Sequence, residues 1–465
     1  MATLGLLDST DPRPVHFVGI GGAGMSALGE LVVRQGVVIS GCDSNPAGAS
    51  DLVALGVSVA TGHDAAHCAG ARAVVYSSAI PLDHPELARA RALGLPVIRR
   101  AEALADAVRG GRLVGIAGTH GKTTTTVMTT DALASAGLNP TGIVGGRVSA
   151  WQGNLRRGGS DVFVVEADEY DRSFLALDPE VAVVTNVEAD HLDIYRDLAD
   201  VHETFARYVS RATYLIVCAD DPGANSLPAP HTAQVVQYGI DAPSARLTAR
   251  DVRVEAGTTV FAAWYDGRLC GEVCLQVPGA HNVRNALAAL AVGLVWGKSV
   301  EAMAPGLATF GGVERRFQRL GEAGGVAVID DYAHHPTEIR ATLAAARSAY
   351  PGRRIVVAFQ PHLFTRTRDF ADEFGEALAG ADLVLLTGIY AAREDPIAGV
   401  TSDLVVNSIR LAGGNLSWHG DRADLANALL NVVRPGDVVL TVGAGDITRT
   451  GGELLARLGR HDAGT

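Results

Sequence analysis

The chain has 465 residues, 48% of them hydrophobic and 19% charged, and a formal net charge of −12 at pH 7. This size predicts two or three domains with large apolar cores, and the acidic balance excludes a general nucleic-acid-binding or anionic-membrane surface. Five cysteines without a C-x-x-C pair, a segment 1–13 without signal-peptide features and the lack of a long apolar run favour a cytoplasmic protein without membrane insertion.

The first hundred residues alternate short apolar runs with helical segments, which predicts a parallel, doubly wound sheet. The first run leads into Gly19-Ile20-Gly21-Gly22-Ala23-Gly24, a G-x-G-x-x-G fingerprint, and Asp43 ends the second run. This pattern fits NAD or another nucleotide diphosphate, because backbone amides at a helix N-terminus bind any diphosphate. Strands are expected at 15–19, 37–42, 57–60, 73–77 and 96–98, and a helix at 101–111.

A second glycine-rich loop, 118–124, follows an apolar run at 113–117 and precedes a predicted helix at 123–136. Only two of the 39 cationic residues are lysines, and one of them is Lys122 in this loop. A compact ammonium fits inside a loop wrapped around phosphates better than a planar guanidinium does. Although Ile116 replaces the first glycine of the strict phosphate-loop spacing, the context predicts ATP binding, with Lys122 on the β- and γ-phosphates and Thr123 on Mg²⁺.

Acidic residues follow two further apolar runs of this central unit. Glu166 ends one run, and His191 lies in the acidic segment after the next. Carboxyl ends of parallel strands beside a phosphate loop can hold hydrated Mg²⁺, and a histidine ligand would also admit Mn²⁺; a solvated acidic loop is the alternative. We expect strands at 162–166, 181–185, 214–218 and 235–238, an antiparallel meander at 246–276 and a helix at 281–296.

Asn282 and Asn285 lie three residues apart at the start of that helix and share one face. They could read the edge of a base, or simply cap the helix. A third α/β unit starts near residue 311, and polar side chains again follow its strands, in segments 330–336 and 360–368. Its expected strands are 326–330, 354–359, 383–387 and 438–442, and its expected helices are 336–350, 370–379, 402–411 and 425–433.

Taken together, the ordered motifs resemble the Mur ligase family over essentially the whole chain, and within it the alanine-adding branch. The motifs that carry the resemblance are GIGGAGMS at 19–26, SSAI at 77–80, GTHGKTTTT at 118–126, EADEYDRSFL at 166–175, TNVEADHLD at 185–193, PGAHNVRNALAA at 278–289, ERRFQ at 314–318, DDYAHHPTEI at 330–339, FQPHLFTRT at 359–367 and GAGDI at 443–447.

The resemblance implies a Rossmann-like UDP-sugar domain at 1–110, a central phosphate-loop domain with an added meander at 111–312, and a Rossmann-like amino-acid domain at 313–465. It also implies a reaction. The lactyl carboxylate of UDP-N-acetylmuramate attacks the γ-phosphate of ATP, and the amine of L-alanine then attacks the acyl phosphate. ATP and Mg²⁺ are the expected cofactors, and we expect a monomer or a weak homodimer without nucleic-acid partners.

By the family's pattern, Glu166 and His191 hold a second metal ion, Arg315 meets ATP from the third domain, and His334 is among the catalytic residues. Residues 194–210 contain no lysine, so the chain lacks the carbamoylated lysine of several sister ligases. The remaining implied contacts are Gly118, Thr119, His120, Gly121, Thr124, His281, Asn282, Asn285, Asp331 and Tyr332 for ATP; Gly21, Gly22, Ala23, Gly24, Met25, Ser26, Ser78 and Ala79 for the UDP-sugar; and His334, His362 and Arg366 for the amino acid and phosphates.

Three alternative readings remain. A murein-peptide ligase of the same branch would join a tripeptide to the same UDP-sugar and should have a wider C-terminal pocket. A nicotinamide-dependent dehydrogenase would use the first fingerprint but leaves Lys122 and Glu166 without a role. A non-catalytic UDP-sugar sensor would not need the phosphate loop.

Overall fold

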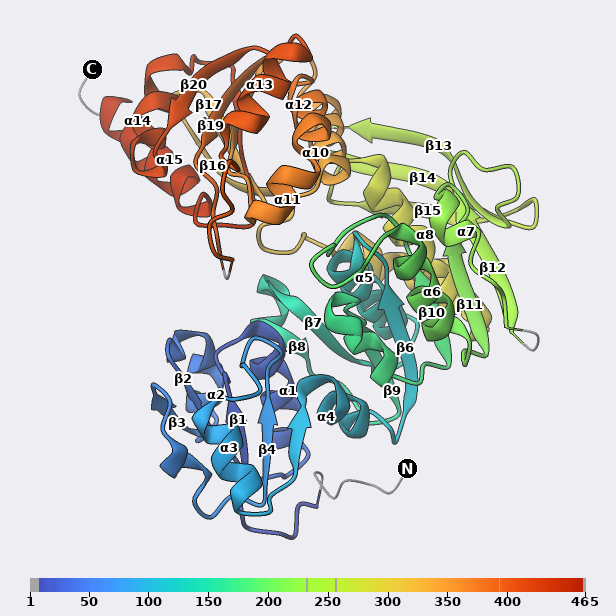
Figure 1. Ribbon diagram of the computed structural model, residues 1–465. Helices are drawn as coiled ribbons and strands as arrows, with labels where there is room; N and C mark the ends of the chain where they lie inside the picture. Colours follow the sequence, from blue (N-terminus) through green and yellow to red (C-terminus); the bar gives the residue numbers. More distant parts are fainter. Residues whose placement is uncertain (1–7, 231–232, 256, 393, 463–465) are drawn as a thin grey trace.

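The computed structural model describes residues 8–230, 233–255, 257–392 and 394–462, and within these ranges the chain forms three α/β domains, each built on its own sheet (Figure 1). This confirms the fold class predicted from the sequence, while the limits 1–110, 111–312 and 313–465 remain proposed. The first seven residues of segment 1–13 and residue 256 of the meander lie outside the described ranges. No helix within those ranges has both the length and the apolar character needed to cross a bilayer.

The N-terminal domain contains a parallel sheet with the strand order β3-β2-β1-β4-β5. Apolar runs form the strands, and the order reverses between β1 and β4, where such sheets bind ligands beyond their carboxyl ends. The strands are β1 (Val15–Val18), β2 (Ile39–Asp43), β3 (Ser58–Thr61), β4 (Ala73–Tyr76) and β5 (Val97–Arg99), and the helices are α1 (Ala23–Arg34), η1 (Pro46–Ala49), α2 (Ser50–Ala54), η2 (Ala65–Cys68), α3 (Pro85–Ala92) and α4 (Arg100–Ala107).

The central domain contains a long mixed sheet with the order β15-β14-β13-β12-β11-β10-β6-β9-β7-β8. The three strands β13 to β15 pair antiparallel, which confirms the predicted meander. The strands are β6 (Arg112–Ala117), β7 (Thr141–Val148), β8 (Gly153–Arg156), β9 (Val162–Glu166), β10 (Val181–Val184), β11 (Tyr214–Cys218), β12 (Gln234–Gly239), β13 (Leu247–Glu255), β14 (Thr258–Tyr265) and β15 (Arg268–Leu275).

Helices cover both faces of this sheet. The 14-residue helix α5 follows the phosphate loop and packs against α8 and α9, and all of its residues from Thr123 to Thr130 are buried. The helices of the domain are α5 (Lys122–Ser135), η3 (Ser149–Trp151), η4 (Tyr170–Ala176), α6 (Leu198–Val209), α7 (Pro222–Asn225), α8 (Ala280–Val295) and α9 (Val300–Ala308).

The C-terminal domain contains a sheet with the order β16-β17-β21-β18-β19-β20, parallel except for the β16–β17 pair. Its strands are β16 (Gln318–Ala323), β17 (Val326–Asp331), β18 (Ile355–Phe359), β19 (Leu383–Thr387), β20 (Leu416–Gly420) and β21 (Val438–Val442), and its helices are α10 (Pro336–Ala349), α11 (Phe364–Asp369), α12 (Ala371–Leu378), α13 (Asp403–Leu411), α14 (Arg422–Val432) and α15 (Thr448–Asp462).

The apolar cores show how the domains are joined. One cluster of buried side chains runs from the N-terminal domain, with Phe17 and Leu28, into the central domain, with Phe163 and Phe205. The C-terminal domain has two clusters of its own, one of them around Phe359. In Figure 1 the N-terminal and C-terminal domains flank the central one. The first two domains therefore share a core, whereas the third packs around its own.

The predicted strands form within two residues of their expected limits. The sequence analysis does not predict β7, β8, β16 and β20; in β7, three glycines, Gly142, Gly145 and Gly146, interrupt the apolar pattern. Helix α9 was missed because Pro305 lies inside it, and proline is disfavoured there. The helix expected at 101–111 ends at Ala107.

Candidate active site

The glycine-rich loop 19–24 joins β1 to α1 at the point where the strand order reverses. The backbone carbonyl of Cys42 accepts the amides of Gly19 and Ile20 at 2.9 and 3.1 Å, and the carboxylate of Asp43 accepts the amide of Gly21 at 2.9 Å. Hydrogen bonds to the last two residues of β2 thus fix the backbone of the loop.

The predicted UDP-sugar residues divide by exposure. Gly22, Ala23, Ser78 and Ala79 are exposed, whereas Met25 is buried in the core of the domain, so only its backbone can face a ligand. The turn that carries Ser78 and Ala79 follows β4 and packs beside the loop. A Cβ built on Gly19 would lie only 3.5 to 3.6 Å from Ile80 and Ser77. The structure therefore brings the two predicted segments together at one edge of the sheet.

Two arginines connect the N-terminal domain to the central domain. A Cβ on Gly24 would lie 3.0 Å from the guanidinium of Arg100, and the same guanidinium lies 4.0 Å from Asp168. Its neighbour Arg99 pairs with Asp171. Segment 166–171, which begins beside the phosphate loop, thus reaches the loop of the N-terminal domain.

The second glycine-rich loop, 118–124, wraps around the side chain of Lys122. Its ammonium donates to the carbonyls of Gly118 and Thr119 at 2.7 and 3.2 Å and to Glu169 at 2.8 Å. Burial would lower the pKa of Lys122, but the carboxylate of Glu169 raises it. The lysine is therefore a permanent cation held at the start of α5, where the helix dipole also favours anions.

Glu166, at the end of β9, lies next to the same loop. Its carboxylate accepts the hydroxyl of Thr123 at 2.8 Å and the amide of Gly145 at 2.6 Å. Burial raises the pKa of Glu166. A carboxylate and a hydroxyl side by side at a phosphate loop offer the oxygen ligands that Mg²⁺ prefers.

His191 adopts a left-handed backbone conformation, with φ 53°. Its Nε2 atom lies 3.5 Å from Glu169, while its buried Nδ1 atom has no hydrogen-bond partner among the described residues. Burial would lower the pKa of His191, but Glu169 and Asp190 raise it. Glu169 therefore links the two predicted residues Lys122 and His191, and the sequence reasoning missed it.

A cavity of about 370 Å³ opens between the central and C-terminal domains. The phosphate loop lines one side of it, and α8 lines another. The predicted ATP residues that line it are His120, Gly121, Thr123, Thr124, His281, Asn282, Asn285 and Asp331.

Three residues of α8 present neutral groups to this cavity, next to Arg284, which also lines it and pairs with Asp220. Burial, with a contribution from Arg284, lowers the pKa of His281 to about 4, so its imidazole is neutral at pH 7. Asn282 is buried and donates to the carbonyl of Pro278 at 2.7 Å. Asn285 is also buried and faces Gly121. Neutral amide and imidazole groups next to a phosphate loop suit a nucleoside triphosphate.

The two adjacent arginines of the third domain point in different directions. Arg315 has φ 61°, and its guanidinium donates to the carbonyls of Gly443 and Gly445 at 2.6 and 3.1 Å, so it does not line the cavity. Arg316 lines it and pairs with Glu338 at 3.2 Å. Both guanidiniums lie over the ring of Tyr332, at 4.7 and 5.1 Å.

His120 bridges the central and C-terminal domains. Its ring nitrogens lie 3.4 Å from Glu188 and 3.4 Å from Glu338. Burial would lower the pKa of His120, but the two carboxylates raise it to about 9. Glu188 also accepts the hydroxyl of Thr337 at 2.7 Å. These contacts hold the third domain over the phosphate loop.

The predicted amino-acid residues gather at the same interface. His334 and His362 have ring centroids 5.9 Å apart, and His362 lies 3.3 Å from Arg366. Arg366 is buried and forms an ion pair with Asp190 of the central domain at 2.7 Å. Burial would raise the pKa of Asp190, but Arg366 keeps it well below its usual range.

The tautomer of His334 follows from its surroundings. Its Nδ1 atom lies 3.0 Å from the carbonyl of Tyr332 and 3.1 Å from Glu338. A carbonyl and a carboxylate only accept hydrogen bonds, so Nδ1 carries the hydrogen and Nε2 keeps its lone pair. Burial lowers the pKa of His334, which favours this neutral form.

Sequence reasoning did not single out several residues of this site: Arg100, Glu169, Glu188, Asp190, Arg316 and Glu338. Four of them lie one to three residues from a predicted site residue. The signal that could have found Glu169 and Asp190 is their position in the acidic segments that follow β9 and β10.

Three family profiles match successive parts of the chain: "Mur ligase family, catalytic domain" over residues 14–112, "Mur ligase middle domain" over 116–293 and "Mur ligase, glutamate ligase domain" over 315–445. A curated UDP-N-acetylmuramate–L-alanine ligase from Cutibacterium acnes is 47% identical, in an alignment that covers 97% of this chain and 98% of that protein.

Among solved structures, UDP-N-acetylmuramate–alanine ligase from Thermotoga maritima superposes with a TM-score of 0.81 at 28% identity, over 97% of this chain and 100% of that one. A murein peptide ligase from Psychrobacter arcticus superposes with a TM-score of 0.70 at 23% identity, over 96% of this chain and 99% of that one, and this likeness concerns the fold alone.

Proposed function

The chain belongs to the Mur ligase family, and on this premise we propose that it joins L-alanine to the lactyl carboxylate of UDP-N-acetylmuramate, with ATP hydrolysed to ADP and phosphate. This reaction supplies a precursor of peptidoglycan, and its substrates favour a cytoplasmic enzyme. The observation that carries the proposal is the phosphate loop around Lys122, which faces the cavity between two domains and lies beside buried carboxylates.

ATP occupies the interdomain cavity in this proposal. The base lies near His281, Asn282 and Asn285, and the phosphates lie on loop 118–124. Lys122 then exchanges its bonds to the loop carbonyls for bonds to phosphate oxygens, since a phosphate is the stronger acceptor. Arg316, which lines the cavity, is better placed than Arg315 to contact the nucleotide in the arrangement described.

The residues at the loop also fit a divalent cation. Thr123 and Glu166 supply neighbouring oxygens at 2.8 Å, and the buried Nδ1 of His191 has no partner among the described residues. We therefore propose that these three side chains hold Mg²⁺. Because one of the ligands is a histidine nitrogen, Mn²⁺ could replace Mg²⁺ at this site. When bound, the ion would offset the negative charge of the phosphates and the carboxylate.

The UDP-sugar lies on loop 19–24 of the N-terminal domain, with Ser78 and Ala79 beside it. Its diphosphate meets the amides at the start of α1, near the guanidinium of Arg100. Segment 166–171 spans from this arginine to Glu166. The lactyl end of the sugar can therefore reach the γ-phosphate while the uridine stays in the N-terminal domain.

The reaction proceeds in two transfers. An oxygen of the lactyl carboxylate attacks the γ-phosphorus, and the bond to the bridging oxygen of ADP breaks. The amine of L-alanine then attacks the carbonyl carbon of the acyl phosphate, and inorganic phosphate leaves. We assign the amine proton to Nε2 of His334, which holds a lone pair, and the carboxylate of alanine to Arg366 and His362. The cations Lys122 and Arg316 reduce the repulsion between the two anionic reactants.

Because the third domain packs around its own core, we propose that it closes over the nucleotide during turnover. The contacts of His120, Thr337 and Arg366 with the central domain belong to this closed arrangement. Closure excludes water from the acyl phosphate, which would otherwise hydrolyse.

Phosphate release from ATP tests the proposal. We expect release only when UDP-N-acetylmuramate and L-alanine are both present, with the alanine amide as the product detected by mass spectrometry. Preference for the tripeptide L-alanyl-γ-D-glutamyl-meso-diaminopimelate would show a murein peptide ligase instead. Binding of NADH without binding of the UDP-sugar would overturn the assignment of the N-terminal domain.

A further inference from the structure

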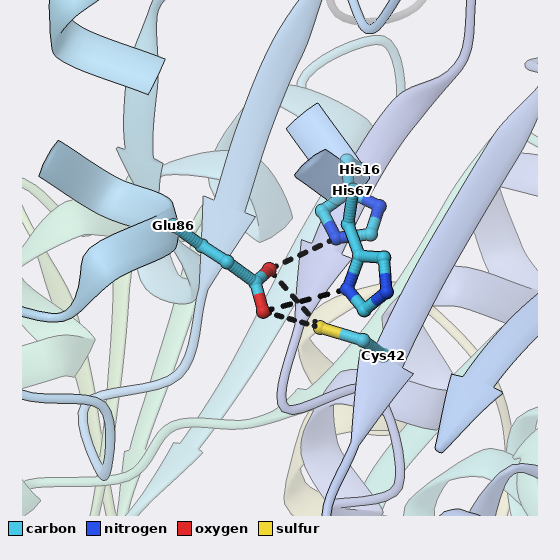
Figure 2. Close-up of side chains that lie close together, drawn as sticks. All are labelled: His16, Cys42, His67 and Glu86. Atoms are coloured by element: carbon cyan, nitrogen blue, oxygen red, sulfur yellow. Dashed lines mark hydrogen bonds and ion pairs between the residues drawn. The ribbon is translucent and has the colours of Figure 1, made fainter. Parts of the chain in front are cut away.

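Four metal-ligating side chains converge inside the N-terminal domain, on the face of the sheet that α3 covers (Figure 2). His16 comes from β1, Cys42 from β2, His67 from η2 and Glu86 from α3. His16, Cys42 and Glu86 are buried, and His67 is half-buried at the edge of the group. None of the four belongs to the proposed ligase site.

The carboxylate of Glu86 lies at the centre of this cluster. Its oxygens lie 3.2 Å from Nε2 of His16, 3.1 and 3.2 Å from Sγ of Cys42, and 3.6 Å from Nδ1 of His67. All four ligand atoms lie within 4.8 Å of one another. In tetrahedral zinc sites, bonds of roughly 2.0 to 2.3 Å place neighbouring ligand atoms about 3.3 to 3.7 Å apart. The cluster is therefore close to this size and needs to contract only along its longest separations.

The donor set selects the class of metal. A thiolate and two imidazoles are ligands for Zn²⁺ and similar transition-metal ions, whereas Mg²⁺ and Ca²⁺ prefer sites made only of oxygen. We propose that His16, Cys42, His67 and Glu86 form a binding site for Zn²⁺ or a similar divalent transition-metal ion, separate from the Mg²⁺ of the ligase reaction.

Neighbouring groups support the ligands from outside. The second ring nitrogen of His16, Nδ1, lies 3.0 Å from the hydroxyl of Ser40, which fixes the ring as outer partners of metal-bound histidines do. The amide of Asp64 approaches both His67 at 3.3 Å and Glu86 at 3.0 Å. When His67 binds the metal, this amide keeps its bond to Glu86.

His63 is a fifth potential ligand at the rim of the cluster. Its Nδ1 atom lies 3.2 Å from Glu86 and 3.3 Å from the sulfur of Cys42, and its ring contacts that of His84. It can serve as an additional ligand or as an outer partner of Glu86. His16, Cys42, Glu86 and His67 alone already supply the four ligands of a closed structural site.

The thiol of Cys42 carries a proton when no metal is bound, whereas the carboxylate of Glu86 does not. Burial would raise the pKa of Glu86, but hydrogen bonds from His16 and Cys42 lower it to about 2, while burial and Glu86 raise the pKa of the Cys42 thiol. Metal binding must therefore release the thiol proton, and the affinity should rise with pH.

The position of the site gives it a structural consequence. The backbone carbonyl of Cys42 accepts the amides of Gly19 and Ile20, and the next residue, Asp43, accepts the amide of Gly21. A metal on the thiolate of Cys42 would fix the end of β2 and thereby support the glycine-rich loop. The cluster lies behind this loop, and none of its four residues is among those proposed to contact the UDP-sugar.

Cobalt titration of the tag-free, full-length protein tests the proposal, because tetrahedral Co²⁺ reports thiolate ligation by a charge-transfer band and visible d–d bands. With saturating Mg²⁺ present to occupy the ligase site, we expect one Co²⁺ per chain, with both kinds of band, and displacement by Zn²⁺. Cys42→Ser should lose the charge-transfer band. The matched control is Cys68→Ser, which should keep the charge-transfer band. The buried thiol of Cys68 contacts the backbone carbonyl of Glu86 at 3.3 Å rather than its carboxylate.

His67→Gln keeps the proposal testable if the serine variant of Cys42 does not fold, since His67 is half-buried and its loss should leave the core intact. Loss of this ligand should weaken Co²⁺ binding at least about tenfold, as loss of even an outer partner does. A wild-type protein without a thiolate-to-cobalt band, or a band that survives in Cys42→Ser, would overturn the proposal. Equal Co²⁺ affinity in His67→Gln and wild type would exclude His67 from the site.

Discussion

The two glycine-rich loops share a strand–loop–helix plan but differ in the charges that surround them. Loop 118–124 encloses Lys122, which pairs with the buried carboxylate of Glu169, and it adjoins Glu166. Loop 19–24 contains no charged residue. The amides of its first three residues donate to the carbonyl of Cys42 and to Asp43, which leaves the amides at the start of α1 for a ligand. Backbone amides suffice to bind a diphosphate, whereas transferring a phosphoryl group to a carboxylate requires fixed cations. We therefore propose that the first loop binds the diphosphate of the UDP-sugar and that the second carries out the phosphoryl transfer.

The strongest test of this division is the substitution Lys122→Ala. We expect phosphate release to fall at least about a hundredfold, as it does when other pre-organised charge stabilisers are removed, while UDP-sugar binding stays unchanged. Steady-state kinetics and calorimetry measure the two quantities. The control is Lys298→Ala, which removes the other lysine, between α8 and α9. Near-normal turnover in a folded Lys122→Ala protein would contradict the role of the second loop.

A smaller loss is expected from the proposed metal ligands. Glu166→Ala and His191→Ala should each reduce turnover by about tenfold to a hundredfold, because they act on the charge-rich transfer rather than on substrate binding. UDP-sugar affinity should remain that of the wild type. Raising the Mg²⁺ concentration should recover part of the activity if the variants bind the ion weakly. Wild-type turnover in both variants would mean that the acidic segment is only solvated.

A substitution in the first loop should weaken UDP-sugar binding, whereas the substitutions at the second loop reduce turnover. A Cβ at Gly21 would lie 2.7 Å from the carbonyl of Asn45 and 3.0 Å from the carboxylate of Asp43, so Gly21→Ala should displace the loop. We expect about tenfold weaker UDP-sugar binding and unchanged ATP affinity, measured by calorimetry. Gly110→Ala is the control, because a Cβ there has no atom within 4 Å. Equal weakening of both ligands would argue against separate sites.

The last effect acts on stability rather than on activity, and it concerns the contact between the second loop and the third domain, which the first loop lacks among the described residues. The pKa of His120 is raised from 6.5 to about 9. Its stabilising contribution is therefore fully present below about pH 6.5 and is lost as the pH rises through about 9, and it amounts to at most about 3 kcal/mol.

Thermal unfolding of wild type and His120→Gln across this pH range checks the prediction. The difference in stability between wild type and His120→Gln should shrink as the pH rises. The control for loss of an imidazole is His202→Gln, which replaces a half-buried histidine on α6. An advantage that grows with pH would show that the neutral form of His120 makes the contact.

How much could be read from the sequence depends on whether a feature is local. Apolar runs such as 162–166 and 214–218 became strands with the same limits, since burial on both faces demands them. The glycine-rich loops could also be located from the sequence, because the spacing of their glycines is a local pattern.

Side-chain direction and pairing could not be read in this way. Arg315 and Arg316 are neighbours in the sequence, yet the left-handed backbone at Arg315 and Phe317 turns one guanidinium toward segment 443–445 and the other toward the cavity. Glu169 meets Lys122 only because β9 lies beside β6. Such contacts depend on tertiary structure, which periodicity does not encode.

In the proposed reaction, phosphoryl transfer at the second loop activates the carboxylate of the UDP-sugar. This step can be followed with UDP-N-acetylmuramate labelled with oxygen-18 in both lactyl carboxylate oxygens. With ATP and L-alanine, we expect one labelled oxygen in the released phosphate and the other in the amide carbonyl. Unlabelled phosphate, with the alanine amide still formed, would contradict the acyl-phosphate route.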